Sequence, residues 1–255
     1  MNILLVIIFG LIFGSFIGST VVRLSNNQSL FSVRSKCPHC GSLIRWNENI
    51  PLFSYLLLKA TSSCCNKKIY YFYPIIETTT LIIFLLNFIL FDATNFLIMN
   101  FLSIFLLIIL FTDLFFFLIF DIVIIILFSL SIYVLLLTEF NPFDTNIISS
   151  SIAFFSSISI FYLIKLIFLK LRGIDGLGVG DIKLIGVLSI ITGLSYLPFL
   201  IIIASLLAIL HLMIVKLMDH KNHIIKIKAP FGTYLVISLF LLIYSNFLNN
   251  YFLGG

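Results

Sequence analysis

Long apolar stretches constrain this chain more than any other feature of its sequence. A helix needs roughly 20 apolar residues to cross a bilayer. Eight stretches are candidates, at residues 3–22, 74–91, 96–112, 118–137, 147–169, 182–196, 197–217 and 232–252. Because open sheet cannot satisfy its backbone in lipid, they predict an all-α membrane protein with about eight transmembrane helices. The sixth stretch is short and only Pro198 separates it from the seventh, so a single re-entrant or broken helix there is an alternative.

Composition excludes a water-soluble globular protein. Hydrophobic residues make up 61% of the 255 residues and charged residues only 10%, whereas soluble domains carry about 25% charged residues. A soluble fold of this size could not bury so much apolar surface. The segment from Met1 to Val22 lacks a basic first part and a small-residue cleavage site, so we expect a retained span rather than a signal peptide.

The placement of the charges predicts the orientation of the spans. With the N-terminus outside, every lysine and arginine falls on an inside segment or an adjoining helix end. The charged residues of the outside segments are all acidic, namely Asp92, Glu139 and Asp144. This agrees with the preference for basic residues in cytoplasmic loops. The net charge of +5 is therefore explained by topology and anionic lipid headgroups, and not by nucleic-acid binding.

These inferences divide the chain into three regions. Residues 1–22 form the first transmembrane helix, residues 23–73 a large cytoplasmic loop, and residues 74–255 a helical membrane domain. The loop contains all four cysteines of the chain: Cys37, Cys40, Cys64 and Cys65. Because the cytoplasm is reducing, thiols or metal ligation are expected there rather than disulfides.

The cysteines form two close pairs, as in structural zinc sites with four thiolate ligands. Cys37 and Cys40 have the two-residue spacing of a zinc knuckle. Cys64 and Cys65 are adjacent, which strains simultaneous ligation without forbidding it. Four reduced thiols in a loop held by other contacts are an equal alternative to a zinc site.

Two aspartates are candidate catalytic residues, because ionisable groups at membrane depth are costly and are often functional. Asp113 and Asp181 lie at the cytoplasmic ends of different expected spans, at one depth, so they could converge. Two carboxyls that approach closely can share a proton and activate one water. Asp121 lies about 12 Å along from Asp113 if helical, too far for a dyad on one helix.

The second aspartate ends a glycine-rich run, Gly176-Leu177-Gly178-Val179-Gly180-Asp181. Glycines permit unusual backbone angles and the close approach of another chain, which an extended peptide beside a catalytic water would require. The run does not match the phosphate-binding P-loop pattern. Each aspartate taken alone could also be an ordinary residue among lipid headgroups.

Together these motifs resemble the prepilin peptidases, also called type IV leader peptidases. An aspartate at a helix end and a second one in a G-x-G-D motif match Asp113 and Gly178-Val179-Gly180-Asp181. The resemblance covers essentially the whole chain, in the expected order. The other segments that resemble the family are Gly14-Ser15-Phe16, Ser35 to Gly41, Ile44 to Tyr55, Tyr73-Pro74 with Glu77, and Pro230-Phe231-Gly232.

The resemblance implies an intramembrane aspartic endopeptidase of the bacterial inner membrane. It implies Asp113 and Asp181 as the catalytic pair, an active site at the cytoplasmic side, and prepilin or pseudopilin precursors as substrates. It also implies a second activity, methylation of the new N-terminus with S-adenosylmethionine. The residues show no cofactor-binding motif of their own. Glu48 and Glu77 could hold an amine, or could equally pair with Arg45 or Lys67 at the lipid surface.

Two departures from the family pattern stand out. The family has Ile-Pro-Asp where this chain has Ile119-Phe120-Asp121, and Asp121 is taken as non-catalytic. The second cysteine pair is usually C-x-x-C, which places Ser62 at its first position, Cys65 at its second, and Cys64 out of register. A transporter with intramembrane carboxylates is the alternative function, although it needs neither the glycine motif nor the cysteine loop. A non-catalytic assembly scaffold is a third.

Overall fold

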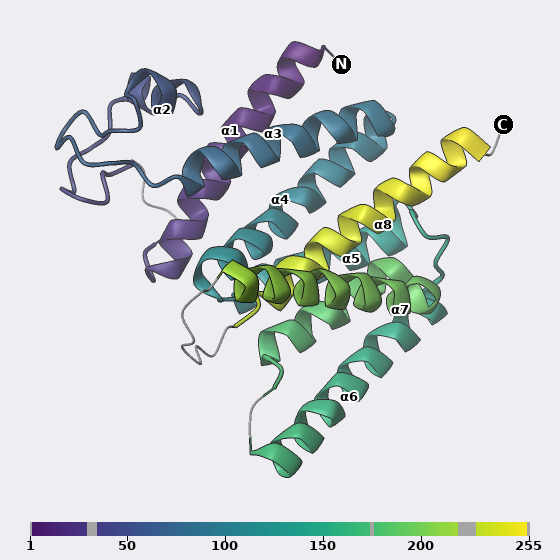
Figure 1. Cartoon of the computed structure of the whole chain (residues 1–255). Helices are drawn as coiled ribbons and strands as arrows, with labels where there is room; N and C mark the ends of the chain where they lie inside the picture. The colour runs from purple at the N-terminus through teal and green to yellow at the C-terminus, as the bar shows by residue number, and fades with distance from the viewer. Residues whose placement is uncertain (1, 30–34, 174–175, 219–227, 254–255) are drawn as a thin grey trace. The chain divides into compact units, whose positions relative to one another are not determined.

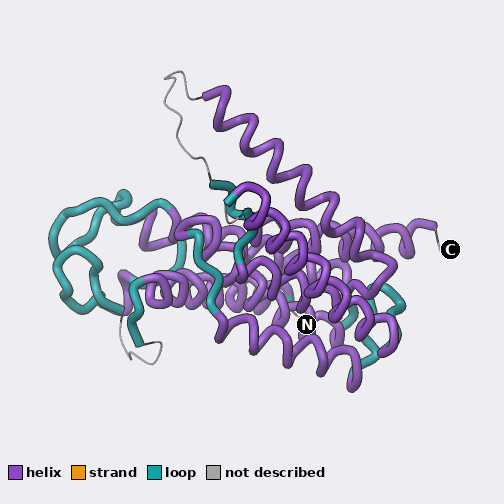
Figure 2. The backbone as a smooth tube through the Cα atoms, turned by 90° about the horizontal axis from the view of Figure 1, so that it is seen from below, coloured by secondary structure: helices purple, strands orange, loops and turns teal. Residues whose placement is uncertain are grey.

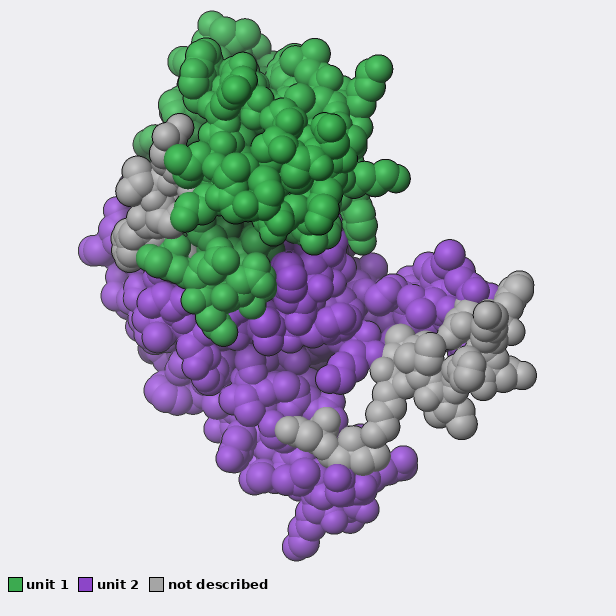
Figure 3. Space-filling model, turned by 90° about the vertical axis from the view of Figure 1, so that its left-hand side faces the viewer, with its two compact units in different colours: residues 1–108 green, residues 109–255 purple. Residues whose placement is uncertain are grey.

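The computed structural model describes residues 2–29, 35–173, 176–218 and 228–253, with side chains up to residue 248. Over these residues the chain forms helices joined by loops, with two isolated β-bridges and no β-strand (Figure 2). The predicted all-α class is therefore confirmed. The chain divides into two compact units, residues 1–108 and 109–255 (Figure 3). This division follows packing, whereas the three regions expected from the sequence follow topology and stay a prediction.

The helices match the apolar stretches of the sequence closely (Figure 1). They are α1 (Ile3–Ser25), α3 (Phe72–Leu90), α4 (Ala93–Phe116), α5 (Asp121–Leu137), α6 (Ile147–Arg172), α7 (Val179–Met218) and α8 (Phe231–Leu253). Among the described residues, six are long and apolar enough to cross a membrane. The helix α5, with 17 residues, is shorter. The protein is thus a multi-pass membrane protein, and the count of eight spans stays a prediction.

The helix α7 covers both of the expected spans on either side of Pro198. Its 40 residues would extend about 60 Å if straight, twice the hydrocarbon thickness of about 30 Å. Non-helical backbone at Gly193, with φ 61° and ψ −174°, divides it into two helical parts. The freed backbone is satisfied by α6, since the hydroxyl of Ser149 accepts from the Leu194 N–H and that of Ser150 donates to the Ile190 carbonyl.

In the first unit, α1 packs against α3 through a row of glycines. Gly10, Gly14 and Gly18 recur every fourth residue and are buried on one face of α1. A methyl group added at Gly14 would lie 2.8 Å from the Glu77 Cα. Such small-residue spacing lets membrane helices approach closely. The contact fixes the part of α3 that carries Glu77 against α1.

The loop between α1 and α3 contains two short helices that the sequence did not predict. They are η1 (Trp46–Glu48) and α2 (Phe53–Leu57). The hydroxyl of Ser54, at the start of α2, donates to the Asn47 carbonyl and accepts from the Ile50 N–H. These bonds fold residues 47–54 into a compact turn.

In the second unit, α7 packs against α5, α6 and α8. The fully buried residues of its first part include Leu184, Ile185 and Leu188, and those of α8 include Leu235 and Leu239. Many other large apolar side chains of α6 and α7 are exposed, as expected for helices surrounded by lipid. The core of this unit brings the beginning of α7, the beginning of α8 and the end of α4 together.

Candidate active site

Asp113 lies in the last turn of α4, and its side chain is only 5% exposed. Its carboxyl group faces the beginning of α8. The Thr233 N–H donates to Asp113 Oδ2 over 2.8 Å, and the Thr233 hydroxyl lies 3.2 Å from the same oxygen. Unpaired N–H groups of a helix's first turn favour negative charge. The sequence therefore places an acid at the end of one helix where the start of another supplies its hydrogen bonds.

Asp181 lies in the first turn of α7, and the structure brings it to Asp113. The two carboxyl groups are close enough for their charges to interact. The backbone N–H of Gly232 is directed toward both of them. Within the described part of the chain, Asp181 Oδ1 is buried without a hydrogen-bond partner. The pair thus combines one oxygen held by donors with another that is buried and has no donor among the described residues.

Three glycines, which have no side chain, make space for Asp113, Asp181 and their neighbour Ile119. A methyl group at Gly178 would lie 2.8 Å from Asp181 Oδ2. The side chain of Ile119 fills the space beside the other two, because a methyl group would meet it at 3.1 Å from Gly180 and 2.7 Å from Gly232. The glycines therefore let three segments meet at the carboxyl groups.

Asp121 lies apart from the pair, at the exposed start of α5. It forms an ion pair with Lys183, with 2.7 Å between Asp121 Oδ1 and Lys183 Nζ. Both side chains are exposed, 66% for Asp121 and 45% for Lys183. An exposed ion pair contributes little to stability, at most about 1 kcal/mol. This geometry agrees with the interpretation of Asp121 as a residue outside the catalytic pair.

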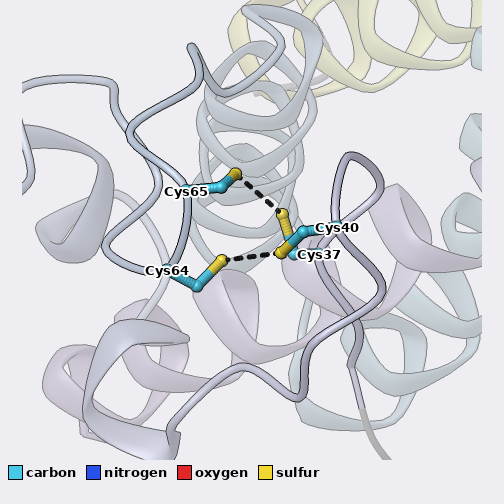
Figure 4. Close-up of side chains that lie close together, drawn as sticks. All are labelled: Cys37, Cys40, Cys64 and Cys65. Carbon is cyan, nitrogen blue, oxygen red and sulfur yellow. Dashed lines mark hydrogen bonds between the residues drawn. The ribbon is translucent and has the colours of Figure 1, made fainter.

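The four cysteines converge in the loop of the first unit (Figure 4). Their Sγ atoms all lie within 4.8 Å of one another. Sγ atoms are 3.8 Å apart between Cys37 and Cys65 and 3.2 Å apart between Cys40 and Cys64. Four thiolates around zinc at about 2.3 Å would be about 3.8 Å apart. The cluster fits a tetrahedral zinc ion, and the adjacency of Cys64 and Cys65 does not prevent convergence.

Two loops with the same hydrogen bonds form this cluster. In the first, Cys37 N–H donates to the Ser42 carbonyl and Gly41 N–H to the Cys37 carbonyl. In the second, the same two bonds join Ser62 with Lys67 and Asn66 with Ser62. Ser62 thus takes the place of Cys37, and Cys65 that of Cys40. The structure supports the register expected from the sequence, in which Cys64 is the displaced member.

The hydrogen bonds around Cys37 favour its thiolate. Burial alone would raise the pKa of this thiol, but the Ser62 hydroxyl and the backbone amides of His39 and Cys40 together lower it to about 6. A lowered pKa supports metal ligation, because the thiolate is the ligand form. His39 is engaged elsewhere, with its Nε2 3.2 Å from the Lys68 carbonyl and its ring beside Tyr70.

Sequence reasoning missed the contacts that three residues make in these sites. Thr233 binds Asp113, Ile119 fills the space beside Gly180 and Gly232, and Ser62 contacts Cys37 and Cys64 with its hydroxyl. Thr233 directly follows the motif Pro230-Phe231-Gly232, and Ile119 lies within Ile119-Phe120-Asp121. Their roles depend on contacts across more than 60 residues, which no local pattern indicates.

Two family models match the chain. The bacterial peptidase A24 N-terminal domain matches residues 8–91, and the type IV leader peptidase family matches residues 80–214. The chain is 30% identical over 217 residues to a prepilin leader peptidase/N-methyltransferase of Vibrio cholerae, covering 80% of this chain and 83% of that protein. It is 27% identical to one of Dichelobacter nodosus, covering 80% and 68%.

A third relative of the same name, from Myxococcus xanthus, is 45% identical over 53 residues. That match is local, and covers 21% of this chain and 16% of the relative. No solved structure matches the chain.

Proposed function

This chain belongs to the type IV leader peptidase family, and from that premise we propose that it cleaves the basic leader from prepilin-like precursors, with Asp113 and Asp181 as its catalytic pair. Membership makes it a peptidase rather than a transporter. The single observation that carries the residue assignment is the approach of these two carboxyl groups from different helices. The active site belongs at the cytoplasmic side of the inner membrane, as the distribution of lysine and arginine favours.

The two carboxyl groups would act on one water. Carboxyls this close do not both ionise readily, so one carries a proton while the other takes a proton from the attacking water. Thr233 donates to Asp113 Oδ2, whereas Asp181 Oδ1 has no hydrogen-bond partner among the described atoms. Asp181 Oδ1 is therefore the oxygen that would bind the attacking water. The water's oxygen then bonds to the scissile carbonyl carbon, and the C–N bond breaks as the proton is passed to the leaving nitrogen. The glycines let the segments that carry the two aspartates approach each other closely.

The second activity in the proposal is N-methylation of the new N-terminus. The names of the relatives support it. S-adenosylmethionine supplies the methyl group, whose bond to the sulfonium breaks as a bond to nitrogen forms. A cavity of about 440 Å³ in the first unit suits such a ligand. Its lining includes Tyr55 and Tyr73, which suit the adenine base of S-adenosylmethionine. It also includes Arg23 and Glu48, whose charges suit the zwitterionic amino-acid part.

Zinc is the metal that the cysteine loop would hold. Cys37, Cys40, Cys64 and Cys65 would be its ligands, and its part would be structural, because four protein thiolates leave no open position for a reactant. Several loop residues beside the cysteines also line the cavity. Loss of the metal should therefore harm methylation more than cleavage.

The test of the proposed function is cleavage of a prepilin-like precursor by purified full-length protein in detergent. Asp113→Asn and Asp181→Asn should each abolish cleavage, because the amide keeps the volume but cannot exchange the proton. The double variant should lose no more than either single one, since the pair acts as a unit. Asp121→Asn is the control and should keep most activity. An essential Asp121 with a dispensable Asp113 would overturn the assignment.

A further inference from the structure

Glu77 is a buried carboxylate in the first unit that the peptidase chemistry does not use. It lies in the first half of α3 and is 7% exposed. The Leu52 N–H donates to Glu77 Oε2 over 2.7 Å, and the Ser15 hydroxyl also bonds to its side chain. Both of these partners are neutral donors, and Arg23 and Lys36 line the same cavity. A buried carboxylate is normally paired with a cation.

Glu77 lines the cavity of the first unit. The cavity of about 440 Å³ lies between α1, the beginning of α3 and the cysteine loop. The volume is within the range of small-molecule sites. Its lining includes neither of the aspartates of the candidate active site. The cavity therefore has its own anionic group and is a site distinct from that pair.

The packing around Glu77 keeps the carboxylate at this place. The contact of Gly14 with the Glu77 backbone holds α3 close to α1, and the Leu52 N–H fixes one carboxylate oxygen. The alternative of pairing with Lys67 at a lipid surface does not agree with this burial. A glutamine could accept the same hydrogen bond from the Leu52 N–H. The acid at this position therefore adds what an amide lacks, the ability to bind a cation and to exchange a proton.

We propose that this cavity is the methyl-transfer site and that Glu77 binds the new N-terminal ammonium group of the cleaved substrate. The inference rests on the proposed N-methyltransferase activity. The ammonium gives one proton to Glu77, and its nitrogen lone pair forms the N–C bond as the S–C bond of the donor breaks. The product is a secondary ammonium group, whose nitrogen keeps its two remaining protons, and the donor leaves as a neutral thioether. Glu77 returns its proton to solvent.

The experiment uses full-length protein in detergent and a synthetic peptide with a free N-terminal phenylalanine followed by an apolar sequence. Because this peptide is already cleaved, its methylation is independent of Asp113 and Asp181. Glu77→Gln keeps the size and the acceptor for the Leu52 N–H but removes the charge. It should lower kcat/KM for peptide methylation by about 100-fold, the scale of losing one partner of a buried charge pair. Precursor cleavage and binding of S-adenosylhomocysteine by calorimetry should change less than about twofold.

Two further variants make the result decisive. Asp92→Asn alters an acid of the same unit outside the cavity and should methylate as the unaltered protein does. Ser19→Trp fills the cavity from α1 without touching the charge of Glu77, and should block methylation while leaving cleavage intact. If Glu77→Gln fails to fold, Ser19→Trp still tests whether the cavity is the methyl-transfer site.

Full methylation by Glu77→Gln or by Ser19→Trp would overturn the inference. An equal loss of S-adenosylhomocysteine binding in Glu77→Gln would also overturn it, because Glu77 would then hold the cofactor rather than the amine. If the unaltered protein cleaves precursor but never methylates the free peptide, the proposed second activity itself fails. If the unaltered protein does methylate the peptide and the variants do so equally well, only the inference on Glu77 and its cavity fails.

Discussion

At the scale of single residues, the cysteine cluster shows how Cys64 offsets the serine at position 62, where the family pattern has a cysteine. The two loops share the same backbone hydrogen bonds, which make Ser62 the counterpart of Cys37. The Ser62 hydroxyl lies 3.5 Å from Cys37 Sγ and 2.9 Å from Cys64 Sγ. The thiol that the family pattern expects at position 62 is therefore replaced by one that reaches the cluster from position 64.

This arrangement predicts a rescue of metal binding. Purified protein should carry about one zinc per chain, and Cys64→Ser should lower that content strongly because one ligand is lost. Adding Ser62→Cys to Cys64→Ser should restore it, since position 62 already faces the other thiols. Elemental analysis after dialysis against a weak chelator measures the content.

The matched control is the pair Ser63→Cys with Cys64→Ser. Ser63 is exposed and is the counterpart of Pro38 in the first loop, so a thiol there should not restore binding. Equal rescue by both double variants would show that the repeated loop geometry does not govern ligation.

At the scale of elements, glycines determine which helices can meet. On α1 they bring α3 close enough to hold Glu77 against the cavity. At Gly193 the positive φ of 61° interrupts α7, and α6 supplies the hydroxyls that satisfy the break. Around the aspartates they admit Ile119 between α7 and α8. Each contact is a place where a side chain would force two segments apart.

The α1–α3 contact predicts an effect confined to one activity. Gly14→Ala places a methyl group 2.8 Å from the Glu77 Cα, where only movement of a backbone can relieve the clash. Overpacking of this kind costs about 1–3 kcal/mol. The melting temperature should fall, and methylation should fall more than cleavage, because Asp113 and Asp181 belong to the other unit.

Gly18→Ala is the matched control on the same face. Its methyl group would meet a ring carbon of Tyr73 at 3.3 Å, and a side chain can move aside. Thermal unfolding in detergent and the two activity assays compare the variants. A larger effect at Gly18 than at Gly14 would contradict this account of the packing.

At the scale of the whole molecule, the charges predict a single orientation in the membrane. All fifteen lysines and arginines lie on one set of connecting segments and the adjoining helix ends. The charged residues of the opposite set are all acidic. Translocating basic residues is unfavourable, so this pattern places the cysteine loop in the cytoplasm.

Labelling with a membrane-impermeant thiol reagent checks the orientation. The four native cysteines, after zinc chelation, should react in inverted membrane vesicles but not in intact cells. A cysteine introduced at Asp144, in a variant with the native cysteines replaced by serine, should react in intact cells. Labelling of native cysteines from outside intact cells would reverse the predicted topology.

The sequence by itself determined the helical class, the approximate ends of the helices and the identity of Asp113 and Asp181 as candidates. These follow from local properties, because a stretch of apolar residues must become a helix in lipid whatever surrounds it. Only the tertiary structure decided that Cys64 joins the other thiols, that Thr233 binds Asp113 and that Glu77 is buried beside a cavity. The reason is that hydrogen bonds, burial and close approach between distant segments depend on how helices pack, and glycine spacing alone does not reveal which partner a helix face will meet.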